Sequence, residues 1–117
     1  MKEGWSDEIP VGIVICDSGG TIEWMNNRAA RIFKGSGGME LVGGNLSNCH
    51  PERAQDKLRE IFDKKEPNGY TVENNGSTVM LYQAPRFVGG EFKGFVEFIF
   101  TVPADIRRLD QVEWVEK

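Results

Sequence analysis

Histidine and cysteine are scarce in this sequence, and their scarcity limits the chemistry that it can support. The 117 residues include a single histidine, His50, and two cysteines, Cys16 and Cys49. Structural zinc sites usually take four side-chain ligands, and the sequence has no Cys-x-x-Cys pair that would begin one. We therefore expect two thiols rather than a disulfide, and no metal site built from protein side chains.

Long apolar runs and clusters of basic residues are also missing. The longest apolar stretches, 11–16 and 95–102, are interrupted by Gly12 and Glu97 and are too short to cross a membrane. Acidic residues occur within the first eight positions, where the apolar core of an export signal would begin. The formal net charge is −4 and the basic residues are scattered, which disfavours nucleic-acid binding. We expect a cytoplasmic domain that contacts neither membrane nor nucleic acid.

The composition is that of one soluble domain. Hydrophobic residues make up 39% and charged residues 27% of the chain, which suits one core and is too little for two. The order of apolar segments and turn residues predicts an α+β fold, with two strands, then helices, then three strands. The expected strands span 9–16, 21–25, 70–73, 78–84 and 92–102, and the expected helical segments follow Asn26 and span 39–42 and 51–65. Asn26-Asn27 can cap the first of these helical segments, because a short side-chain carbonyl satisfies an unpaired amide there.

The segment that begins at Pro51 gives the clearest helical signal. Proline suits the first helical position, where an amide would have no partner. Ala54, Leu58, Ile61 and Phe62 recur at helical spacing and form one apolar stripe. We expect this stripe to pack against the sheet.

Turn residues separate the last three strands. Asn75-Gly76 predicts a two-residue hairpin, because both residues tolerate a positive φ. Pro85 stands where a strand can end, and Gly89-Gly90 predicts the next turn. The last strand is the most apolar, so we expect it at the centre of the sheet.

Two sets of side chains alternate along the last strand, and they point to opposite faces of the sheet. One set is Val96, Phe98, Phe100 and Val102, and the other is Phe95, Glu97, Ile99 and Thr101. We expect the first set to face the core, since it is uniformly apolar. Burying an unpaired carboxylate is costly, so we expect Glu97 to face solvent or a dimer interface.

Five segments, in their order and spacing, resemble the PAS family of sensory domains. Residues 9–17 and 20–26 resemble its opening hairpin, and residues 40–46, Glu-Leu-Val-Gly-Gly-Asn-Leu, resemble its Glu-Leu-(Ile/Val)-Gly-x-x-(Leu/Phe) segment. His50-Pro51-Glu52 resembles the start of its long helix, and residues 94–102 resemble its final strand.

The resemblance covers residues 8–106, so we take 1–7 and 107–117 as flanks. It implies a five-stranded antiparallel sheet with helices between strands two and three packed on one face. It also implies a signal-transduction module, not an enzyme, that binds a small molecule between sheet and long helix, forms homodimers and regulates an attached effector domain. The candidate pocket residues are Cys49, His50, Leu58, Phe62, Met80, Tyr82 and Phe98.

Cys49 and His50 leave more specific interpretations open. Cys49-His50-Pro51 is similar to a PAS subtype that accompanies hemerythrin-like domains in some proteins, and a haem- or redox-responsive domain would use His50 or Cys49. Haem-binding PAS domains, however, place their axial histidine further into the long helix, near Asp56 here. Asn48-Cys49 resembles the flavin-reactive pair of light-oxygen-voltage domains, but the residues that follow differ. A ligand-free dimerisation module is the remaining interpretation.

After the last strand, Ile106, Leu109, Val112 and Val115 recur every three residues. This is a weak amphipathic signal, and a helix this short needs a partner surface. It predicts either a tail that folds over the sheet or the start of a linker helix that carries the state of the domain to an effector or pairs two copies. The second interpretation predicts a dimer that weakens when residues 106–117 are removed.

Overall fold

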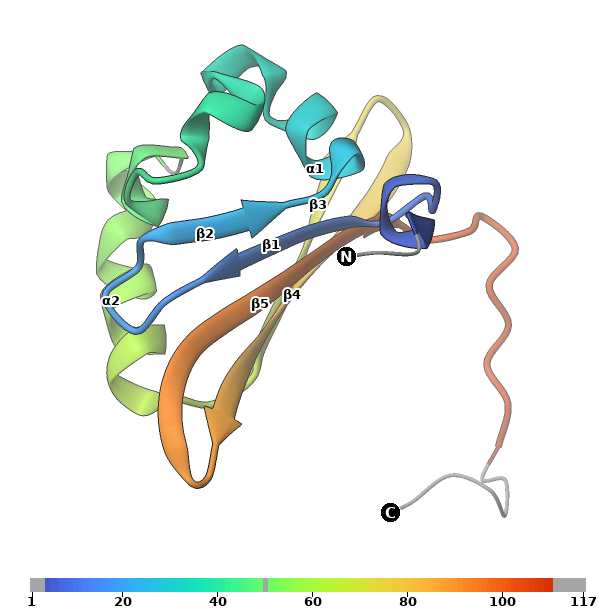
Figure 1. Ribbon diagram of the computed structural model, residues 1–117. Coiled ribbons are helices and arrows are strands. Elements are labelled where there is room, and N and C mark those ends of the chain that lie inside the picture. Colours follow the sequence, from blue (N-terminus) through green and yellow to red (C-terminus); the bar gives the residue numbers. More distant parts are fainter. Residues whose placement is uncertain (1–3, 50, 111–117) are drawn as a thin grey trace.

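The computed structural model describes residues 4–49 and 51–110. One antiparallel sheet has the strand order β2-β1-β5-β4-β3. The helices lie between β2 and β3 in the sequence and cover one face of the sheet (Figure 1). The predicted α+β fold is therefore confirmed, and so is the central position of the last strand. The bounds of the main elements are β1 Gly12–Cys16, β2 Ile22–Met25, α1 Asn27–Ile32, α2 Gln55–Lys64, β3 Asn68–Asn74, β4 Ser77–Val88 and β5 Glu91–Thr101.

Asn26 sets the start of α1 and ties it to the N-terminal segment. Its Oδ1 accepts hydrogen bonds from the backbone N–H of Ala29, at 3.0 Å, and of Ile13, at 2.9 Å. Its Nδ2 donates to the carbonyl oxygens of Ser6 and Val11. The side chain is fully buried. Asn26 is thus the N-cap that its position predicts, and it also joins β1 to the residues before it.

The long helix begins later than Pro51. A 3-10 turn, η5 (Glu52–Ala54), precedes α2, and Pro51 caps that turn in extended conformation. The predicted apolar stripe does face the sheet: Ile61 is buried, and Leu58 and Phe62 pack against the core. The ring of Phe62 meets the ring of Phe95 edge to face, with centroids 4.9 Å apart.

The face of the sheet that carries the core is the opposite of the one we expected. Phe95 and Ile99 are 2% and 3% exposed, whereas Val96, Phe98 and Phe100 are only partly buried. The inner face, defined here as the one under α2, therefore carries Phe95, Glu97 and Ile99. The outer face carries the set predicted for the core. Both sets are largely apolar, so hydrophobicity along this strand does not identify the side that the helices cover.

The hairpin between β3 and β4 is the predicted two-residue turn. Asn75 and Gly76 have φ of 51° and 82°, as a type I′ turn requires. The expected end of β4 at Pro85 is wrong, because β4 continues to Val88. Pro85 is tolerated since β3 pairs with β4 only as far as Gln83, which leaves one edge of β4 without a partner strand at the proline.

The C-terminal segment leaves the sheet after β5 and extends away from it (Figure 1). Residues 103–110, the part of the tail that the structure describes, form no helix, and Ile106 and Leu109 are 68% and 67% exposed. The helix that the apolar spacing predicts therefore does not form in this part of the tail, as expected for a short helix without a partner surface. Val112 and Val115 lie outside the described residues. No helix within the described ranges is long and apolar enough to span a membrane.

Candidate ligand-binding site

The space between α2 and the inner face of the sheet is filled by the side chains of the domain. The remaining void has a volume of about 10 Å³, room for at most one water molecule. It is lined by Val14, Cys16, Leu46, Leu58, Ile61, Phe62, Gln83, Phe95 and Glu97. The described residues therefore enclose no preformed chamber for a larger ligand at this position.

A row of polar side chains crosses this apolar interior on three neighbouring strands. Gln83 Nε2 on β4 donates to Glu97 Oε2 on β5 at 2.7 Å, and Asn68 Nδ2 on β3 donates to Gln83 Oε1 at 2.8 Å. Strand register explains the row, because Gln83 lies opposite both Glu97 and Asn68. We call Asn68, Gln83 and Glu97 the polar row.

The position of Glu97 corrects our expectation that it faces solvent or a dimer interface. Its side chain lies on the inner face and is 3% exposed. Burial of a carboxylate is costly when the group lacks hydrogen-bond donors, and here the amide of Gln83 supplies one. The cross-strand partner, which cannot be recognised from the strand's own residues, makes the buried position tolerable.

A wider cleft opens where α2 meets the edge strand β3. Its volume is about 610 Å³, within the range of small-molecule sites. Its walls combine apolar side chains, the cations Arg53 and Lys57, and two members of the polar row, Asn68 and Gln83. The complete lining is Pro51, Arg53, Ala54, Lys57, Leu58, Ile61, Asn68, Gly69, Tyr70, Val72 and Gln83. We call this the α2–β3 cleft; the polar row runs from it to Glu97 in the interior.

The structure divides the predicted pocket residues between two faces of the sheet. Leu58 and Phe62 lie on α2 against the inner face, and Leu58 lines the α2–β3 cleft. Phe98 lies on the outer face, and Tyr82 and Met80 share that face because they pair with Phe98 and Phe100. These three side chains and the two on α2 therefore do not line one pocket.

The two remaining predicted residues lie at the end of a 3-10 turn. Cys49 is the last residue of η4 (Leu46–Cys49), and its side chain is not described. His50 lies outside the described residues. Within the described ranges, no group of three or more His, Cys, Asp or Glu side chains is arranged to hold a metal ion.

Haem and flavin do not fit the described interior. The void enclosed between α2 and the inner face of the sheet, about 10 Å³, has no space for either ring system. Phe62 and Phe95, in ring contact, occupy the place between the helix and the sheet. Either cofactor would require α2 to move away from the sheet.

The thiol of Cys16 is buried at the base of this interior, with 2% of the residue exposed. Desolvation raises the pKa of the thiol to about 11, although the backbone of Phe95 opposes the shift. A thiol with this pKa is protonated at neutral pH and is a poor nucleophile. Cys16 is thus a small core residue.

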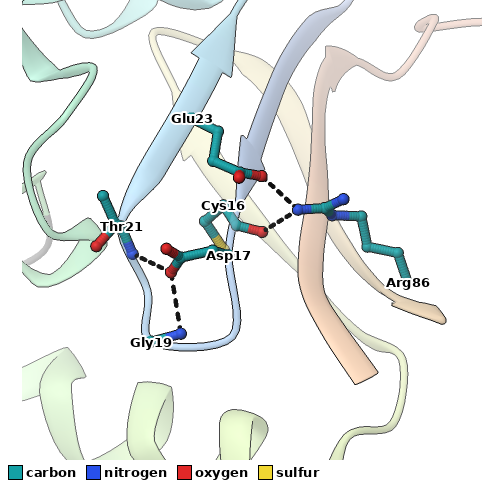
Figure 2. A network of polar contacts seen from close by, with 6 residues as sticks. All are labelled: Cys16, Asp17, Gly19, Thr21, Glu23 and Arg86. Atoms are coloured by element: carbon teal, nitrogen blue, oxygen red, sulfur yellow. Dashed lines mark hydrogen bonds and ion pairs between the residues drawn. The ribbon is translucent and has the colours of Figure 1, made fainter. Parts of the chain in front are cut away.

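A second polar network joins the β1–β2 hairpin to β4 (Figure 2). Arg86 Nη2 donates to the carbonyl oxygen of Cys16 at 3.0 Å and pairs with the carboxylate of Glu23. Gly94 lies on β5, between β1 and β4, and has a φ of 119°. It is so close to the backbone of Cys16 and Asp17 that a Cβ atom at this position would overlap that backbone. Asp17 Oδ1 closes the hairpin turn by accepting from the N–H groups of Gly19 and Thr21. This network holds the hairpin in place.

Sequence reasoning missed Asn68 and Gln83. Asn68 stands in a Pro-Asn-Gly segment that resembles an ordinary turn, and Gln83 stands in a strand whose faces were assigned the wrong way round. The available signal was Glu97, an acid inside the most apolar strand. A buried acid requires a hydrogen-bond donor on a neighbouring strand. Gln83 is an amide on the other strand of the hairpin that Gly89-Gly90 closes, and it lies opposite Glu97.

Comparisons with known proteins agree with this geometry. Among solved structures, the chain is similar to the PAS domain of BvgS from Bordetella pertussis, with 18% identity, a TM-score of 0.64, and coverage of 86% of this chain and 83% of the other. It is also similar to a sensory box sensor histidine kinase from Vibrio cholerae, with 16% identity, a TM-score of 0.59, and coverage of 85% and 87%. At these identities the likeness shows the fold alone.

A third similar structure is the Aer2 receptor from Vibrio cholerae, described as a dual PAS-haem oxygen sensor. It shares 20% identity with a TM-score of 0.59, and the match covers 80% of this chain and 95% of the other. No curated protein matches the chain. The sequence profile of the PAS domain matches residues 7–67, more than half of the chain. With the profile, the strand order and the helices on one face in agreement, the chain belongs to the PAS domain family.

Proposed function

We propose that this PAS domain is the sensory part of a regulatory protein, and that it binds a small polar molecule in the α2–β3 cleft. The observation that carries the proposal is the polar row, whose outer members line the cleft and whose inner member is buried in the central strand. Similarity to the sensor regions of histidine kinases supports a signalling role. The amides of Asn68 and Gln83 offer both donors and acceptors to a ligand.

The polar row also supplies a route from the ligand to an effector. A ligand that bonds to Gln83 competes with Glu97 for the same amide, so occupancy of the cleft changes the hydrogen bonding of β5. That strand ends at Thr101 and leads directly into the C-terminal segment. An effector domain attached there would receive the change as a shift between two hydrogen-bonded states of the strand.

We place the homodimer contact on the outer face of the sheet. Met80, Tyr82 and Phe98 form an apolar surface there, and Tyr82 is 40% exposed. Val96 continues this surface along β5, and Ile15 and Trp24 continue it on β1 and β2. The helices α1 and α2 lie over the other face of the sheet (Figure 1), which favours pairing of this face with a second copy.

A screen of small polar metabolites by chemical-shift perturbation in ¹⁵N-labelled protein tests the cleft. A true ligand shifts the amides of Asn68 and Gln83 and loses about tenfold in affinity in Asn68→Ala, because one direct hydrogen bond to it is removed. Thr71→Ala is the matched control, since Thr71 is exposed on the same strand and does not line the cleft. Equal affinity in both variants, or shifts confined to the outer face, would place the ligand elsewhere.

A further inference from the structure

A second cleft lies at the opposite end of the inner face, between α1 and the strands β3, β4 and β5. Its volume is about 480 Å³. The sheet is left open here because α1 has only six residues and α2 covers the other end. Val72 on β3 lines both this opening, which we call the α1 cleft, and the α2–β3 cleft.

The floor and one wall of the α1 cleft are apolar. Val79, Leu81 and Ile99 come from paired positions on β4 and β5 and form the floor, while Ile32 and Phe33 at the end of α1 form the wall. Ile32 and Val72 are 45% and 44% exposed. An apolar ligand surface would cover side chains that now face water, and this contact would favour binding.

The charges at the α1 cleft are of one sign. Arg28 and Arg31 are the charged residues among its described lining, and no described acid lines it, although the chain as a whole carries −4. The two arginines are three residues apart on α1 and so project from neighbouring positions. Neither forms an ion pair with a described residue. The carboxylate of Asp7, near the start of α1, is already held by the N–H of Asn27 at 2.9 Å.

We infer that the α1 cleft binds an amphiphilic carboxylate, with its hydrocarbon part on Val79, Leu81 and Ile99 and its carboxylate paired with Arg28 and Arg31. Arginine matches a carboxylate in geometry and remains charged throughout the physiological pH range. A mostly apolar cleft of a few hundred cubic ångströms with two cations in its lining suits a small ligand that has one charged end. Val72 is the one described lining residue that the two clefts share, and the inference does not depend on the function proposed for the α2–β3 cleft.

Titration with decanoate below its micelle concentration, followed by ¹⁵N chemical shifts, tests the inference. We expect saturable shifts at Val79, Leu81 and Ile99. Decanol, which has the same chain without the charge, should bind about tenfold more weakly, and acetate, which has the charge without the chain, should not bind measurably. Equal affinity for decanoate and decanol, or no saturable shift with decanoate, would overturn the inference.

The double variant Arg28→Gln/Arg31→Gln should weaken decanoate binding at least about tenfold. Neither arginine has an ion-pair partner among the described residues, so the folded state should persist, and an unchanged melting temperature checks this. Arg53→Gln/Lys57→Gln is the matched control, because it also removes two cations, here from the lining of the other cleft. Loss of binding in the control but not in the first variant would assign the ligand to the α2–β3 cleft. Binding to phosphatidylglycerol vesicles without binding to free decanoate would show a membrane surface instead.

Discussion

Individual residues hold the elements of this domain in register. The side chain of Asn26 makes four hydrogen bonds that join β1, α1 and the N-terminal segment, and Gly94 allows β5 to pass close to the backbone of Cys16 and Asp17. Neither role depends on hydrophobicity. Each role depends on a few atoms of one side chain or backbone position, so a single substitution at such a residue should change stability measurably.

Gly76→Val should destabilise the domain by about 1 kcal/mol or more. Gly76 has a φ of 82° in the β3–β4 turn, a conformation that a β-branched residue adopts only at a cost. Urea denaturation measures the change. Gly35→Val is a control, because Gly35 has open space around it and no positive φ. Equal stability of the two variants would contradict the strain argument.

Cys16 should make stability fall with rising pH in the alkaline range. Its folded-state pKa is about 11, against an ordinary value of 9.0, so the unfolded chain releases the thiol proton first. The contribution is fully present below about pH 9 and is lost as the pH rises toward about 11. Denaturation of the wild type and Cys16→Val across this range isolates the effect, because other groups titrate in both. Parallel curves would show that the thiol is accessible in the folded state.

At the scale of elements, α2 is held by its apolar face. The other side of the helix carries exposed ion pairs, such as Lys64 with Glu60, whose Nζ and Oε1 atoms are 2.8 Å apart. They lower the pKa of Glu60 and raise that of Lys64, yet pairs this exposed contribute little to stability. Packing against Phe95 and the inner face therefore decides whether α2 stays docked.

Ile61→Ala should lower the free energy of unfolding by about 2–5 kcal/mol. Leu58→Ala should lower it by less, to an extent near the lower end of that range. Ile61 is 7% exposed, while Leu58 is partly buried and also borders the α2–β3 cleft. Thermal or chemical denaturation ranks the two variants, with the exposed Asp63→Ala as the reference. If Ile61→Ala lowers the free energy of unfolding by less than about 1 kcal/mol, half of the smallest expected loss, α2 packs through another face.

At the scale of the whole molecule, the interior under α2 is filled by side chains, and the outer face of the sheet carries an apolar surface. The purified protein should show neither a Soret band nor flavin absorption, because the void enclosed between α2 and the inner face of the sheet has a volume of about 10 Å³. Absorbance spectra before and after incubation with haem or flavin measure this. A stoichiometric Soret band would mean that α2 moves aside on binding.

The outer face should pair two copies of the domain in a concentration-dependent dimer. Tyr82→Glu should weaken the dimer by placing a charge on the apolar surface, and removal of residues 106–117 should weaken it if the tail contributes. Sedimentation equilibrium measures both variants. Ser36→Glu is a control for charge alone, because it adds the same charge at an exposed position in the 3-10 turn Lys34–Ser36, away from the outer face. A strict monomer at high concentration, or a dimer indifferent to Tyr82→Glu, would remove the outer face from this role.

The local pattern of residues was enough to predict the strands, the helical stripe of α2, the Asn75-Gly76 turn and the cap at Asn26, because each depends on neighbours within a few positions. The buried face of β5, the continuation of β4 past Pro85 and the polar row depend on which strands lie side by side. Glu97 is the clearest example: its own strand indicates exposure, whereas Gln83, fourteen residues away and opposite it in the sheet, makes its burial tolerable. Contacts between distant segments are formed by folding in three dimensions, so they cannot be read from periodicity along the chain.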